Sequence, residues 1–203
     1  TPSFGGAPRR ITSILGTGTY VVPDDISVIK VIVTGGGGGG GSHNTDDAQG
    51  GGGAGGTSIK IINVIPGTQY YCTIGGGGSA SVGNTNGGGG TGGSSSFGSE
   101  CSATGGTGTP QWAIGGRGGV GSGGNLNLYG SDGHCGNIDG GGNEESGGNG
   151  GDSYWNGAGT GGSTWGARRT ARGWGCGGSG AHAGTTNDGT PGMQGAVVIE
   201  EYQ

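Results

Sequence analysis

The chain has 203 residues, of which 64 are glycine, 27% are apolar and 10% are charged, with a formal net charge of −5. This composition provides too few apolar side chains for a large hydrophobic core, and a sparse, slightly acidic set of charges does not suit neutralisation of nucleic-acid phosphates. No stretch approaches the ~18 consecutive apolar residues that indicate a membrane-spanning helix. We therefore expect no nucleic-acid partner and no membrane insertion.

The residues before the first glycine run predict the start of a small β-sheet. Residues 1–34 are expected to form an N-terminal arm and the first head strands. Residues 19–22 and 28–34 are rich in β-branched and aromatic side chains, which favour strands, and the turn residues Pro23, Asp24 and Asp25 separate them.

Glycine runs dominate residues 35–195 and begin with seven consecutive glycines at 35–41. A glycine run normally indicates a flexible linker. The phase of the other residues argues against this, because the pattern Gly-Gly-x-Gly-Gly-x recurs at 52–57, 89–94, 115–120 and 147–152. A period of three places every x on one edge of a polyproline-II-type helix and leaves two glycine edges free to pack. Collagen shares this period but requires abundant proline, and the chain has only 6 prolines. The pattern therefore predicts a polyglycine-II body, in which extended threefold helices hydrogen-bond to one another.

Further strands are expected at residues 58–65, 69–74, 95–97 and 102–104, so that 57–74 and 94–104 are head strands inserted into the body. Residues 196–203 are the closing head strand. No helical period of useful length occurs. The predicted fold is mainly irregular and β: a small antiparallel head formed by both termini, a polyglycine-II bundle with distal loops, and no α-helix.

The order strand, glycine run, polar loop, glycine run, strand indicates excursions out from the head and back. Loops 42–49, 79–86 and 109–114 should therefore gather at the end of the body remote from residues 197–201. Later turns are expected near 152–156, 163–174 and 182–191.

Several segments resemble a known family. Residues 18–23, 28–41, 66–70 and 195–200 look like the glycine-rich domain at the C-terminus of bacteriophage tail fibres. In organisation the chain is similar to the tip adhesins of T-even phages, whose variable loops contact the host receptor. The resemblance implies a non-enzymatic, receptor-binding tip domain on the distal end of a tail fibre in the virion. It also implies a bacterial outer-surface protein or glycan as partner, an upstream fibre shaft, a homotrimeric assembly and no cofactor. Related domains occur in bacterial surface proteins, so a location on the bacterial cell surface is the alternative.

Aromatic and basic residues in the second half of the chain are the binding candidates, since Trp, Tyr and Arg dominate recognition surfaces. The alternative role for each Trp is packing against the glycine bundle. The receptor-binding candidates are Trp112, Tyr154, Trp155, Trp165, Arg168, Arg169 and Trp174, with His43 and Asp46 in the first loop.

Other functions find less support in the residues. A structural cap that terminates a fibre is one alternative, and an ice-binding polyglycine-II protein is another, although the loops are long, aromatic and charged rather than flat and Thr-rich. Residues 147–155 fit a single calcium-binding nonapeptide, without the stacked copies such sites use. No catalytic motif and no zinc spacing is present, so we expect no enzyme activity and no metal.

The four cysteines, Cys72, Cys101, Cys135 and Cys176, allow three pairings if all are bridged. Disulfides and free thiols both remain open. The pairing of Cys135 with Cys176 is the first to examine, because both lie among loop signals.

Overall fold

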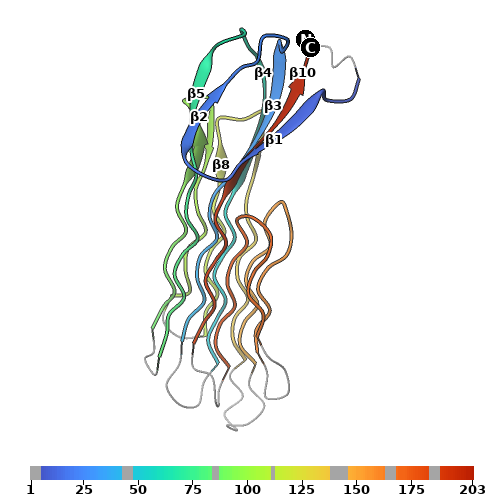
Figure 1. Ribbon diagram of the computed structural model, residues 1–203. Helices are drawn as coiled ribbons and strands as arrows, with labels where there is room; N and C mark the ends of the chain where they lie inside the picture. The colour runs from blue at the N-terminus through green and yellow to red at the C-terminus, as the bar shows by residue number, and fades with distance from the viewer. Residues whose placement is uncertain are drawn as a thin grey trace.

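The computed structural model describes residues 6–42, 48–83, 87–110, 113–137, 146–162, 168–182 and 188–203. Figure 1 shows two β-sheets, which we call the head, at one end of an elongated molecule; the glycine-rich chain runs away from them as side-by-side extended segments. None of the described residues forms a helix, and so none could cross a membrane as one. The predicted fold class is confirmed.

The head consists of two antiparallel sheets of five strands each. In spatial order, the first sheet contains β1 (Arg10–Ile14), β10 (Ala196–Tyr202), β3 (Val28–Thr34), β4 (Thr57–Asn63) and β9 (Leu126–Leu128). The second contains β2 (Gly18–Val21), β5 (Gln69–Thr73), β6 (Ser95–Phe97), β7 (Cys101–Ala103) and β8 (Gly121–Ser122). The expected pairing of strands from the two ends of the chain in one sheet is present as β1 and β10, and short strands from the glycine-rich region, β6, β7 and β8, contribute to the second sheet.

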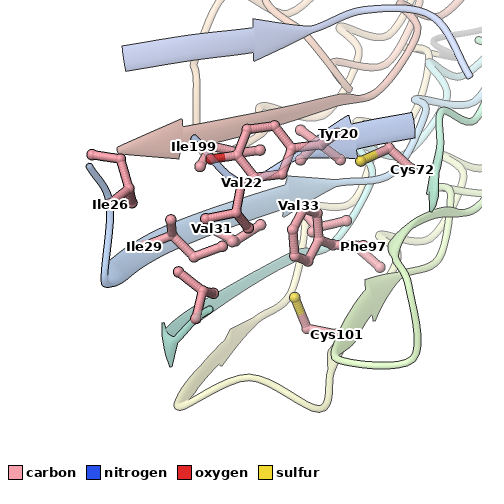
Figure 2. Close-up of a cluster of buried hydrophobic side chains, with 13 residues drawn as sticks. Tyr20, Val22, Ile26, Ile29, Val31, Val33, Cys72, Phe97, Cys101 and Ile199 are labelled. Atoms are coloured by element: carbon pink, nitrogen blue, oxygen red, sulfur yellow. The ribbon is translucent and has the colours of Figure 1, made fainter. Parts of the chain in front are cut away.

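A small hydrophobic core lies between the two sheets, as Figure 2 shows. Alternate residues of β3 and β10 point into it, and the Phe97 ring lies against Tyr70 with 4.6 Å between ring centroids. The residues of these strands that lie in the core recur every second position, because successive side chains of a strand point to opposite faces of the sheet. This core fixes the head although the chain is poor in apolar residues.

Buried polar contacts tie the two ends of the described chain together in the head. Glu201 of β10 is 1% exposed, and it accepts hydrogen bonds from Arg10 Nε at 2.7 Å and from the Tyr20 hydroxyl at 3.1 Å. Burial raises the pKa of Tyr20, and the charge and hydrogen bond of Glu201 raise it further. A carboxylate removed from water needs such partners.

The glycine body is a bundle of threefold helices joined through their backbones. The N–H groups of residues 36–41 donate to three other runs in rotation, to Gly93, Met193, Gly53, Gly90, Thr190 and Gly50 in turn. Their carbonyls accept from three further runs, from Gly106, Gly78, Gly178, Thr109, Ser81 and Ala181 in turn. Each partner run recurs every third residue, as the three residues per turn of a polyproline-II helix require. The predicted hydrogen-bonded bundle is therefore confirmed, and run 35–42 lies at its interior with six neighbouring runs.

Close backbone packing explains why the central run is all glycine. A Cβ placed on Gly36 or Gly39 would lie less than 3.0 Å from the carbonyl oxygen of Gly76 or Ser79, respectively. At the perimeter only two residues in three face neighbours, and Thr91, Arg117 and Asn149 occupy the exposed third position. In these perimeter runs the Gly-Gly-x pattern therefore marks the outward position, whereas the x residue Ala54 of the hexad at 52–57 is buried.

Outward side chains also complete the hydrogen bonding of the perimeter. Thr107 Oγ1 accepts from the Arg117 N–H at 2.7 Å, and Thr104 Oγ1 accepts from the Val120 N–H at 2.8 Å. Asp132 Oδ1 accepts in the same way from the Gly118 N–H at 2.7 Å. Such bonds satisfy backbone donors that face no neighbouring carbonyl.

Candidate functional site

The end of the bundle opposite the head, which we call the distal end, is formed by the described residues that flank the gaps in the described chain. Its parts are held together by hydrogen bonds: the Ser42 and Ser81 hydroxyls lie 2.8 Å apart, and Thr109 Oγ1 donates to the Gly50 carbonyl at 2.8 Å. Figure 1 shows this end farthest from the sheets. The residues flanking the predicted loops 42–49, 79–86 and 109–114 therefore gather remote from β10, as predicted, while 43–47, 84–86 and 111–112 lie outside the described residues.

Polar contacts make the distal end rigid. The Gly83 N–H donates to Asp188 Oδ1 at 2.6 Å. This bond joins the residue before the gap at 84–86 to the residue after the gap at 183–187. The Arg168 guanidinium donates to the Asp188 carbonyl, and its Nη2 lies 3.9 Å from the Asp188 carboxylate. Gln49 is 1% exposed, and its Oε1 has no hydrogen-bond partner within the described part of the chain. The distal end is thus a fixed platform from which loops can present side chains.

Exposed apolar side chains also occur on this platform. Val82 is 66% exposed and Ile114 is 57% exposed, each next to a gap. Exposed apolar side chains beside polar groups are typical of interaction surfaces.

The structure separates the predicted binding residues into groups. Trp112, Trp165, His43 and Asp46 lie outside the described residues. Arg168 lies at the distal end, tied to Asp188. Arg169 follows it, pairs with Thr160 through the backbone and has an exposed side chain.

Tyr154, Trp155 and Trp174 do not lie at the distal end, so their expected placement was wrong. The Trp155 Nε1–H donates to Thr34 Oγ1 at 3.0 Å, and Thr34 is the last residue of β3. Figure 1 shows the corresponding yellow-orange and orange turns just beyond the sheets rather than at the far end. The reason is the direction of the chain: the run 147–152 returns from the distal end, so the turn after it falls on the head side. Without strand residues at this return turn, the sequence pattern did not reveal it.

These three aromatic rings form a packed cluster. The Trp155 ring makes edge contacts with Tyr154 and with Trp174, at centroid distances of 5.0 and 5.2 Å. Beneath them the Cys176 thiol donates to the Asn156 carbonyl at 3.1 Å, and burial raises the pKa of this thiol against the opposing effect of hydrogen bonds from Ser153. Trp155 and Trp174 are half-buried, whereas Tyr154 is 48% exposed. Packing therefore accounts for the two tryptophans, and only Tyr154 offers a free face.

All four cysteines are free thiols, so of the two alternatives left open by the sequence the structure has free thiols, and Cys135 and Cys176 are not paired. Cys135 is exposed on the perimeter, whereas Cys176 is buried beneath the aromatic cluster on the head side. Cys72 and Cys101 lie in the core between the sheets (Figure 2). The described residues contain no group of three or more His, Cys, Asp or Glu side chains that could hold a metal ion.

A polar hollow on the flank of the body was not foreseen from the sequence. This flank pocket has a volume of about 260 Å³ and is lined by His134, Asn149, Gly150, Asp152, Asn156, Gly157, Ala158, Gly159 and Thr160. Asn149 and Asp152 are the x residues of the Gly-Gly-x hexad at 147–152, so their outward direction could have been read from the period of three. Their proximity to Thr160 depends on the return turn, which carried no sequence signal.

Comparison with known proteins identifies the domain type. A protein-family model described as a glycine-rich domain matches residues 12–202, from within β1 to the end of β10. No curated protein matches the chain.

Proposed function

The chain belongs to the glycine-rich domain family, and we propose that it is the receptor-binding tip of a phage tail fibre, a non-enzymatic adhesin that recognises a bacterial surface protein or glycan through its distal loops. One observation carries the proposal: a rigid bundle gathers the ends of separate loops on a platform opposite the head. Rigid scaffolds that present clustered loops are the usual arrangement for recognition.

The position of the chain ends supports this orientation. β1 and β10 pair along Arg10–Ile14 in the head, so an attachment through either end of the chain leaves the distal end free. In the proposed assembly the head faces the upstream fibre shaft, the domain is part of a homotrimer in the virion, and neither nucleic acid nor membrane insertion is involved. A bacterial cell-surface location is the alternative setting for the same adhesive role.

The proposed contact residues are those of the distal end and its loops. Trp112, Trp165, Arg168 and Arg169 combine large apolar faces with hydrogen-bond donors, and His43 and Asp46 add polar groups. Trp155 and Trp174 are better explained by packing.

Cell binding tests the proposal. Fluorescently labelled protein is incubated with a panel of bacterial strains and their surface extracts, and bound protein is measured by cytometry and pull-down. We expect specific binding to some strains, and we expect Trp112→Ala and Trp165→Ala to reduce it by roughly tenfold or more, the effect of losing a hot-spot side chain of ~1.4 kcal/mol or greater.

A matched arginine pair controls for charge. Arg169→Ala should weaken binding, whereas Arg117→Ala, which removes another exposed arginine, on the flank of the body, should not. If the correctly folded, assembled protein bound no strain, the structural-cap function would replace the proposed adhesin function. Ice binding is disfavoured because the loops are long, aromatic and charged rather than flat and Thr-rich.

A further inference from the structure

The flank pocket lies between three neighbouring runs whose backbones hold it open. The His134 N–H donates to the Asn149 carbonyl at 2.8 Å, and the Gly150 N–H donates to the Gly159 carbonyl at 2.8 Å. These bonds link the runs that carry the lining residues. The hollow is therefore part of the rigid bundle rather than a gap between mobile loops.

Two of the lining side chains, Asp152 and Asn149, accept backbone hydrogen bonds through one terminal atom, while their other terminal atom is not bonded within the described chain. Asp152 Oδ1 accepts from the Gly157 and Ala158 N–H groups at 3.1 and 2.9 Å, and no bond within the described chain engages Oδ2. Asn149 Oδ1 accepts from the Gly161 N–H at 2.8 Å, which leaves the Nδ2 donors unused by the described residues. Preorganised groups with spare hydrogen-bonding capacity lower the entropic cost of binding a ligand.

The turn that closes the pocket has an unusual backbone conformation. Asn156 has a φ of 59°, in the left-handed region, which Asn adopts more readily than most residues. This conformation reverses the chain between Asp152 and Thr160, so that both line the same hollow.

The lining chemistry selects the class of ligand. Its side chains offer an imidazole, two carboxamides, one carboxylate and one hydroxyl, and apart from glycine only Ala158 is apolar. Such mixed donors and acceptors suit a ligand whose hydroxyls both donate and accept. A phosphate or acidic sugar finds no Lys or Arg in the lining and meets the Asp152 carboxylate. Calcium requires six to eight oxygen ligands, and the lining has a single carboxylate.

We propose that the flank pocket binds one neutral sugar residue, so that the domain has a lateral glycan site separate from its distal loops. The volume of about 260 Å³ lies just below the ~300–1,000 Å³ typical of drug-sized ligands and suits a single hexose ring. The proposal rests on the pocket alone and holds or fails independently of the distal adhesive function.

Protein-observed NMR with a defined panel tests it. The probes are the methyl glycosides of glucose, galactose, mannose, N-acetylglucosamine, N-acetylgalactosamine and rhamnose, titrated into the intact chain. We expect at least one to bind with a Kd on the order of millimolar, as for a ligand of about a dozen heavy atoms at ~0.3 kcal/mol per atom. Backbone amide shifts should then be confined to the lining residues.

Two variants assign the site. His134→Ala removes an exposed imidazole that makes no hydrogen bond within the described chain, and Asp152→Asn retains the Oδ1 cap on the turn. Each should weaken sugar binding roughly three- to tenfold, the loss expected for one hydrogen bond. Thr91→Ala, an exposed change on another run, should leave it unchanged. Absence of binding by every glycoside, or equal binding by wild type, His134→Ala and Asp152→Asn, would overturn the proposal.

A distal variant separates this site from the adhesive one. The double variant Trp112→Ala/Trp165→Ala should retain sugar binding in the flank pocket while losing cell binding. Loss of sugar binding in this double variant, with the fold preserved by thermal melting, would place the sugar at the distal loops and contradict the flank site.

Discussion

The indole N–H of Trp155 donates to the hydroxyl of Thr34 at 3.0 Å, which joins a turn of the body to the last residue of β3. Thr34 also shares a hydrogen bond of 3.0 Å with Thr57, the first residue of β4. Both threonines are buried, and the bond from Trp155 reaches the point where the first sheet ends and the glycine runs begin. This ring therefore stabilises the junction of head and body.

Truncating Trp155 should lower stability rather than change recognition alone. Trp155→Ala is expected to reduce the free energy of unfolding by ~2–4 kcal/mol, because it removes a half-buried ring packed between two others. Trp155→Phe should cost about 1 kcal/mol, chiefly the bond to Thr34. Urea titration followed by circular dichroism measures both. If Trp155→Ala were as stable as wild type and bound cells more weakly, the ring would have a recognition role instead.

Substitutions at Gly36 and Gly76 separate two reasons for glycine in the runs: the lack of space for a Cβ and the conformational freedom of the backbone. A Cβ on Gly36 would clash with the Gly76 carbonyl, whereas a Cβ on Gly76 meets no atom within 4 Å. Gly36→Ala should therefore cost at least ~3 kcal/mol or prevent folding. Gly76→Ala should be neutral, or stabilising by about 0.5 kcal/mol, because alanine restricts the unfolded chain.

Gly89→Ala extends the comparison to a second run, where the clash is with the Gly39 carbonyl, and should behave like Gly36→Ala. Thermal melting and expression yield of the three variants are the measurements. Equal tolerance at Gly36 and Gly76 would mean that the runs are not in direct backbone contact.

Strands were predicted correctly where the local residue pattern matches the way the side chains pack in the folded protein. The strands at 28–34 and 196–202 have the expected bounds, because their β-branched residues alternate into one core. β1, β8 and β9 were missed: the five residues of β1 include only two apolar ones, Ile11 and Ile14, which are three positions apart and show no strand period, and β8 and β9 are strands of two and three residues in glycine-rich sequence. The pairing of β1 with β10 and of β9 with β4 depends on partners far away in the chain, which short-range pattern does not reveal.

The candidate site was predicted less well than the fold. Clustering of the early loops followed from runs of similar length, but the placement of Trp155 depended on knowing that the chain turns back between 152 and 158 on the head side. That turn is built by Asp152 and Asn156, whose residue types are equally typical of an exposed loop. Composition alone does not distinguish the two ends of the body.

The cysteines should differ strongly in reactivity. Burial raises the pKa of Cys72 and of Cys101 to about 11, so both remain protonated at pH 8. Cys135 is exposed. Because the thiolate is the nucleophile, N-ethylmaleimide should label Cys135 on the order of a hundredfold faster than either core cysteine.

Peptide mass spectrometry of timed samples checks this, with labelling in urea as the control in which all four thiols react. Rapid labelling of Cys72 in the folded protein would mean that the head opens readily. A mass two units lower with Cys135 unlabelled would instead indicate a disulfide.

The pH dependence of stability should reflect Glu200 and its partners. Burial acts to raise the pKa of Glu200, but hydrogen bonds from the Tyr202 hydroxyl at 2.7 Å and the Lys30 ammonium at 3.0 Å, with the charge of Lys30, lower it overall. A carboxyl whose pKa is lower in the folded state stabilises the fold above its ordinary pKa of 4.5. This contribution is lost as the pH falls from 4.5 through the folded value.

The same contact acts in the opposite direction at alkaline pH. The hydrogen bond to Glu200, followed by burial and the Glu200 charge, raises the pKa of Tyr202 from 10.0 to about 12. Its contribution to stability is therefore complete below pH 10 and is lost between pH 10 and 12. Glu200→Gln should reduce both the acid and the alkaline loss, because it removes the carboxylate on which both shifts depend.

Melting temperatures of wild type and Glu200→Gln, measured from pH 3 to pH 12 at constant ionic strength, check this expectation. The two curves should lie farthest apart between pH 5 and 9 and converge toward both extremes, because the carboxylate contributes only when Glu200 is ionised and its bond to Tyr202 only when Tyr202 is protonated. Tyr202→Phe serves as the control: it should remove the alkaline component and retain the part of the acid component that Lys30 supplies. Parallel curves for wild type and Glu200→Gln across the whole range would contradict the assignment.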